Sequence, residues 1–162
     1  MLIKINRDDL VKQITEHRKQ LHPNVPWTQS SFVEFTLPRN TGKTTAIMQQ
    51  ANKKDVIICG SGILTCHYRQ KIGWKTSSII NIKEYCSIYR NDIPEVIDVK
   101  DCHILKGMSL VGSTAYGDSP VIWLDEIEPE HMDVVDKFVN SIIFQWGIKP
   151  VVISLRTISR IK

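Results

Sequence analysis

The chain has 162 residues, of which 42% are hydrophobic and 23% are charged, and these proportions exclude a disordered or fibrous protein. The net charge of +4 permits contact with nucleic acid but does not argue for it, because phosphate binding usually requires a concentrated basic face. The sequence has no run of 18 apolar residues and no recognisable targeting signal. We therefore expect residues 1–162 to form one cytoplasmic domain that does not associate with a membrane.

Residues 1–28 are predicted to form an N-terminal helix and a lead-in to the rest of the domain. Asn6 is a suitable N-cap, and Asp8 and Asp9 fall in the first turn, where negative charge is favourable. Apolar residues then recur at helical spacing, namely Leu10, Val11, Ile14 and Leu21. Pro23 ends the pattern, because the residue before a proline is disfavoured in a helix. This apolar face predicts packing against the domain, with a partner-binding helix as the alternative.

Strand-like and helix-like segments alternate along the remainder of the chain. The strand-like segments are 31–37, 55–59, 77–82, 121–124 and 151–155. The helix-like segments are 43–52, 63–71, 83–90 and 129–146. Several of the strands are apolar throughout, which is typical of a parallel sheet covered on both faces. We therefore expect an α/β fold, a three-layer sandwich with a mostly parallel sheet.

The segment 37–45, Leu-Pro-Arg-Asn-Thr-Gly-Lys-Thr-Thr, contains the Gly-Lys-Thr half of the phosphate-binding pattern GxxxxGK[ST]. Gly42 would let the backbone approach a phosphate, Lys43 would reach the β- and γ-phosphates, and Thr44 would bind Mg²⁺. Leu37 replaces the first glycine of the pattern, and an ordinary surface turn is the alternative. The predicted strand before the segment and the predicted helix after it favour the phosphate loop.

Two acids, Asp125 and Glu126, follow the apolar run 121–124 directly. A buried parallel strand that ends in acids delivers carboxylates to the edge of the sheet where ligands bind. We expect Asp125 to hold Mg²⁺ and Glu126 to activate the water that attacks the γ-phosphate. In the alternative, the two acids simply begin the next helix.

A third polar group lies at the end of the last predicted strand. Ser154, Arg156 and Thr157 could place a hydroxyl or a guanidinium near the γ-phosphate. We consider Ser154 and Thr157 as sensor residues, and a solvated strand end is the alternative.

Together, the loop and the acidic pair resemble the viral DNA-packaging ATPases, the large terminase subunits, and more loosely the superfamily 1 and 2 helicases. The resemblance implies an additional-strand, RecA-like P-loop core that binds ATP and Mg²⁺. It implies that the nucleotide-binding residues are Pro38, Arg39, Asn40, Thr41, Gly42, Lys43, Thr44 and Thr45. It also makes Arg39 a contact to the γ-phosphate and Gln29 a candidate contact to adenine. Asn40 stands where those proteins usually have glutamine.

The resemblance favours an ATPase, encoded by a phage and acting in the host cytoplasm with DNA or a protein partner. We expect a homo-oligomer or a larger complex, because 162 residues leave no room for a nuclease domain or a second motor lobe. One alternative is an accessory protein that binds nucleotide or phosphate without hydrolysis and contacts DNA or another protein. Another is a small-molecule or nucleoside kinase, although the acidic doublet fits hydrolysis better than phosphoryl transfer to a small acceptor.

Overall fold

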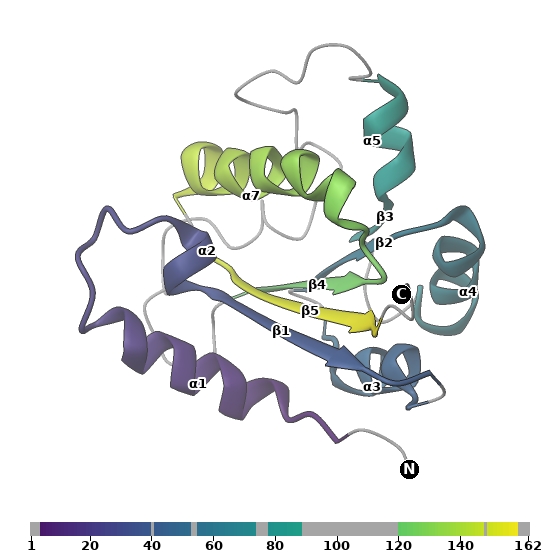
Figure 1. The fold of residues 1–162 in the computed structure, drawn as a ribbon, viewed down its shortest axis with the longest axis horizontal. Helices are drawn as coiled ribbons and strands as arrows, with labels where there is room; N and C mark the ends of the chain where they lie inside the picture. The colour runs from purple at the N-terminus through teal and green to yellow at the C-terminus, as the bar shows by residue number, and fades with distance from the viewer. Residues whose placement is uncertain are drawn as a thin grey trace.

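The computed structural model describes residues 4–39, 41–52, 55–73, 78–88, 120–147 and 149–158. Five strands form one sheet, with the bounds β1 (Phe32–Leu37), β2 (Val56–Cys59), β3 (Ser78–Asn81), β4 (Val121–Asp125) and β5 (Val151–Thr157). Their order across the sheet is β1-β5-β4-β2-β3, and all neighbouring pairs are parallel (Figure 1). The predicted α/β fold with a parallel sheet is confirmed.

Helices cover both faces of the sheet. One layer consists of α1 (Arg7–Arg18), α3 (Lys43–Gln50) and α4 (Gly62–Ile72). The other consists of α2 (Trp27–Ser30), α5 (Ile82–Ile88) and α7 (Met132–Trp146), with the short 3₁₀ turn η1 (Pro129–His131) before α7. Figure 1 shows α7 and α2 on one side of the strands and α1 and α3 on the other. The architecture is therefore the three-layer sandwich that the sequence predicts. Among the described helices, none is long and apolar enough to cross a membrane.

The core consists of two apolar layers, one on each face of the sheet. Alternate strand residues point to opposite faces. In β4, for example, Trp123 packs with α3 and α4, whereas Leu124 packs with α7. Both side chains are fully buried, as are all the residues of β2 and β4. Burial on both faces explains why these strands are continuously apolar in the sequence.

The N-terminal helix forms as predicted but ends earlier. The side chain of Asn6 accepts a hydrogen bond from the backbone N–H of Asp9 at 3.0 Å, which confirms the N-cap. The helix stops at Arg18 rather than continuing to Leu21. The Arg18 guanidinium donates to the carbonyl of Pro150 at 2.8 Å, so the end of α1 is attached to the segment that enters β5. Helix α2 was not predicted.

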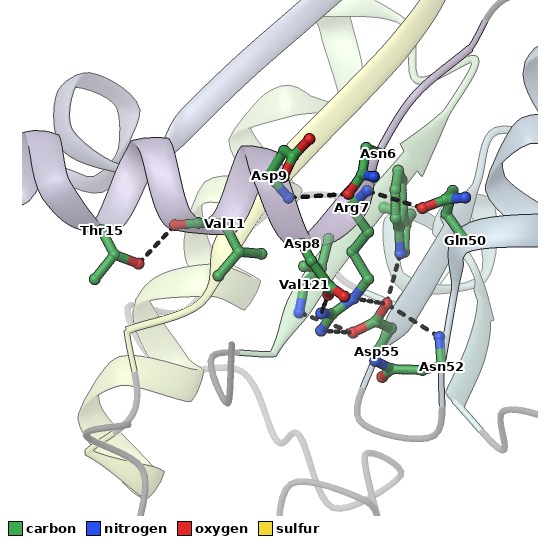
Figure 2. Close-up of polar contacts among 11 residues, drawn as sticks. Asn6, Arg7, Asp8, Asp9, Val11, Thr15, Gln50, Asn52, Asp55 and Val121 are labelled. Carbon is green, nitrogen blue, oxygen red and sulfur yellow. Dashed lines mark hydrogen bonds and ion pairs between the residues drawn. The ribbon is translucent and has the colours of Figure 1, made fainter. Parts of the chain in front are cut away.

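A buried ion pair joins α1 to the amino-terminal edge of the sheet (Figure 2). Arg7 donates to the Asp55 carboxylate through Nε at 2.8 Å and through Nη2 at 2.7 Å. Asp55 precedes β2 directly, and it also accepts from the backbone of Val121 at 3.1 Å, from Trp123 Nε1 at 2.9 Å and from the backbone of Asn52 at 3.2 Å. The Asp55 side chain is fully buried, and the Arg7 side chain is 3% exposed. This network fixes α1 at the edge of the sheet opposite to the predicted phosphate loop.

Candidate functional site

The three polar groups predicted from sequence follow the ends of three neighbouring strands. The segment 38–42 follows β1, Glu126 follows β4, and Thr157 is the last residue of β5. Because β1, β5 and β4 are adjacent and parallel, these ends meet at one edge of the sheet. Ligands of open α/β sheets bind at this carboxyl edge.

The phosphate-loop segment turns sharply into helix α3. Gly42 has φ 76° and ψ 33°, a left-handed conformation that glycine adopts without strain. It is the N-cap of α3, and Lys43 is the first helical residue. The Thr41 hydroxyl donates to the Pro38 carbonyl at 3.0 Å across the turn. The first backbone N–H groups of α3 have no partner within the helix, so they are suited to receive an anion.

Two hydroxyl groups converge on Asp125 at the end of β4. Thr44 Oγ1 donates to Asp125 Oδ2 at 2.7 Å, and the Tyr68 hydroxyl donates to the same oxygen at 2.6 Å. Asp125 and Tyr68 are both fully buried. Within the described residues, Asp125 Oδ1 is buried and has no hydrogen-bond partner. A buried polar atom in this state is uncommon, and water, an ion or another ligand could satisfy it.

The protonation of Asp125 depends on this environment. Burial raises the pKa of Asp125 above its ordinary 3.8, while the hydrogen bonds from Tyr68 and Thr44 oppose the rise. The nearby Glu126 carboxylate raises the pKa further, and the Lys43 ammonium lowers it. Burial and the neighbouring carboxylate also raise the pKa of the Tyr68 hydroxyl, so it remains a proton donor. The ionised form of Asp125 is therefore costly without a cation beside it.

An ion pair connects the loop to the second acid. Lys43 Nζ lies 3.2 Å from Glu126 Oε1, and the Thr157 hydroxyl donates a hydrogen bond to the same oxygen. The Lys43 side chain is 10% exposed, whereas that of Glu126 is 37% exposed, so the carboxylate is open to solvent. The lysine, the acid and the strand-end hydroxyl predicted from sequence are thus in direct contact.

The backbone of Glu126 is fixed from both sides. Its N–H donates to the carbonyl of Leu155 at 3.0 Å, and the N–H of Gly60 donates to the carbonyl of Asp125 at 3.0 Å. Glu126 has φ 57°, the only described non-glycine residue with a positive φ. Gly60, the residue after β2, approaches so closely that a β-carbon there would lie 2.0 Å from the Glu126 carbonyl oxygen. The main chain of three strands therefore sets the position of this acid.

Comparison with protein-family models, with curated proteins and with solved structures gives no match for this chain. Thr44 and Asp125 offer a hydroxyl and a carboxylate, which are the oxygen ligands that Mg²⁺ prefers. The buried, unpartnered Oδ1 is consistent with such an ion, so the residues present fit a magnesium site.

Two predicted residues lie away from this group. The Ser154 hydroxyl donates to Glu34 Oε2 at 3.1 Å. Leu155 packs on the α3 and α4 face, so Ser154 points to the opposite face of the sheet. Gln29 is exposed on α2, before the amino end of β1, and the six residues of β1, about 20 Å of extended chain, separate it from the loop. Neither side chain is brought to the group at the carboxyl edge.

The remaining predicted residues belong to the loop and its helix. Pro38, Arg39 and Thr45 are exposed, and Asn40 lies outside the described residues. The glycine-containing segment 112–117, which the resemblance to terminases also covers just ahead of the acidic strand, lies outside them too. No sequence motif marks Tyr68, a lone aromatic residue in a helix. For Gly60 the only signal was its place in Gly-Ser-Gly directly after an apolar strand.

Proposed function

We propose that this chain is a P-loop nucleotide-binding protein that hydrolyses ATP with Mg²⁺. The observation that carries the proposal is the pairing of two consecutive loop residues with two consecutive acids. Lys43 contacts Glu126 at 3.2 Å, and Thr44 contacts Asp125 at 2.7 Å. Strand β5 lies between β1, which leads into the loop, and β4, which leads into the two acids.

In this proposal the loop and α3 bind the phosphates. The amides at the start of α3 and the Lys43 ammonium neutralise the β- and γ-phosphate charge, and the exposed Arg39 reaches the γ-phosphate from the loop. Thr44 and Asp125 hold Mg²⁺, which when bound neutralises charge that develops on the phosphate oxygens. A fixed carboxylate and hydroxyl in a buried site need little reorganisation during the reaction.

Glu126 orients the attacking water and accepts its proton. Without nucleotide, the Glu126 carboxylate pairs with the Lys43 ammonium. When nucleotide is bound, a phosphate would take the place of this carboxylate beside Lys43. A triphosphate competes for Lys43 and so releases Glu126 toward water. Thr157 donates to Glu126 and links the end of β5 to the position of this base. The partners that the resemblance implies, DNA, another protein or further copies of this chain, remain part of the proposal.

Two substitutions test these roles. Glu126→Gln is expected to bind MgATP but to hydrolyse it at least about a hundredfold more slowly, because general-base catalysis is worth at least this much. Lys43→Ala is expected to lose most of the nucleotide affinity. Phosphate release and binding of a fluorescent ATP analogue are measured with and without DNA. Glu16→Gln and Lys12→Ala, which change exposed residues of α1, are the matched controls.

The outcomes separate the parts of the proposal. Wild-type turnover in Glu126→Gln would show that the base is wrongly assigned. Binding of MgATP without turnover by the wild-type chain would leave only the nucleotide-binding part. Failure of the wild-type chain to bind MgATP would overturn the proposed function.

A further inference from the structure

Tyr68 lies outside the loop motif and the acidic pair, yet it makes one of the shortest contacts of the site. It extends from the middle of α4, is fully buried, and donates its hydroxyl to Asp125 Oδ2 at 2.6 Å. Its ring packs in the same apolar cluster as Ile57, Trp123 and Ile47. A hydroxyl in such surroundings has few choices of partner, so its direction is fixed by the packing of the ring.

The hydrogen bonds on Asp125 are divided unequally between its two oxygens. A carboxylate oxygen has about two lone-pair directions. Thr44 and Tyr68 both donate to Oδ2, at 2.7 Å and 2.6 Å, and together they use its capacity. Oδ1 is buried and unpartnered within the described part of the chain. The carboxylate is thus held with two hydrogen bonds on one oxygen and, from the described residues, none on the other, which is buried.

We infer that Tyr68 is a positioning residue that holds Asp125 so that Oδ1 is presented to Mg²⁺. This inference rests on the proposed function. Without the Tyr68 hydroxyl, only Thr44 would hold the carboxylate, and Thr44 is itself expected to bind the ion. Groups that orient metal ligands in this way typically contribute tenfold to a hundredfold to metal affinity.

The test is the Mg²⁺ dependence of nucleotide binding by Tyr68→Phe, which removes the hydroxyl and keeps the ring. A fluorescent N-methylanthraniloyl ATP is titrated in EDTA and then with increasing MgCl₂. We expect the Mg²⁺ concentration at half-saturation to rise about tenfold or more, while the affinity measured in EDTA stays unchanged. The control is Tyr85→Phe, which removes a hydroxyl from a buried tyrosine of α5 on the opposite face of the sheet and is expected to alter neither quantity.

Three results would contradict the inference, and they differ in whether the proposed function fails as well. If Tyr68→Phe binds Mg²⁺ and nucleotide as the wild type does, Tyr68 does not position Asp125, and the proposed function stands. If Tyr68→Phe loses affinity equally in EDTA and in MgCl₂, the role of Tyr68 is only structural. If the wild type binds no nucleotide, or shows no Mg²⁺ dependence, the proposed function fails together with the inference.

A second measurement needs no substitution of Tyr68 by another amino acid. The chain contains four tyrosines, so protein labelled with 3-fluorotyrosine gives four ¹⁹F resonances. Removing the other three tyrosines one at a time identifies that of Tyr68. We expect this resonance to shift when MgCl₂ is added to the complex with a non-hydrolysable ATP analogue, and to stay in place in EDTA. If the ¹⁹F chemical shift of Tyr68 does not change when MgCl₂ is added, the inference is overturned, even if Tyr68→Phe fails to fold.

Discussion

Replacing Arg7 with Met should strongly destabilise the fold, because it leaves the Asp55 carboxylate buried without its counter-charge. Asp55 is fully buried and Arg7 is 3% exposed, so water compensates neither partner (Figure 2). Breaking a buried ion pair from one side costs about 3–5 kcal/mol. Donors on Asn52, Val121 and Trp123 remain, and methionine retains much of the apolar stem of arginine. We therefore expect the lower end of the range, about 3 kcal/mol.

Urea unfolding followed by tryptophan fluorescence measures this loss, since the buried Trp123 contacts Asp55 directly. For a chain of this length, about 3 kcal/mol corresponds to a fall in Tm of about 6–12 °C. The matched control is Asp8→Asn, because Asp8 also pairs with Arg7 at 3.0 Å but is 80% exposed. An exposed pair contributes at most about 1 kcal/mol. Equal effects of the two substitutions, or a loss below about 1 kcal/mol in Arg7→Met, would refute the reasoning.

Two further predictions concern the carboxyl edge. Gly60→Ala would place a methyl group 2.0 Å from the backbone oxygen of Glu126, so we expect a loss of about 3 kcal/mol or more in urea unfolding. In contrast, Gly62→Ala meets its nearest atom at 3.5 Å and should be neutral or stabilising; similar losses in both variants would contradict this explanation. Asp125→Asn should raise the Tm of the nucleotide-free chain at neutral pH, because burial raises the pKa of Asp125 and so penalises its ionised form. The same variant should lose Mg²⁺-dependent nucleotide binding. If its Tm in EDTA is lower than that of the wild type, the ionised carboxylate does not destabilise the fold.

The sequence predicts the meeting of the loop and the acids for a simple physical reason. Parallel strands place all their carboxyl ends at one edge, so a Gly-Lys-Thr after one strand and two acids after another come close together. The pattern does not predict which strand lies between them. The five strands are confirmed, but the order that inserts β5 between β1 and β4 depends on long-range packing.

Ser154, which was expected at the site, and three residues that the sequence did not single out show where a local pattern is insufficient. Ser154 and Thr157 are three residues apart on one strand, and an odd spacing places their side chains on opposite faces. Alternation alone therefore indicates that only one of them can face the loop. Arg7 and Asp55 are separated by 48 residues, and no local pattern pairs two charges so far apart. No local pattern marks Tyr68 either, because its proposed role depends on one hydrogen bond, to Asp125, that forms only in the folded chain.

The left-handed backbone of Glu126 has an energetic consequence for the whole molecule. A residue with a β-carbon is about 1–2 kcal/mol less favourable than glycine in this conformation. Glycine at position 126 would therefore relieve this backbone strain. The peptide groups beside Glu126 are hydrogen-bonded to Leu155 and to Gly60, which holds the residue in this conformation. Backbone conformation alone would favour glycine at this position, so the cost of an acid here is consistent with the proposed role of the Glu126 carboxylate.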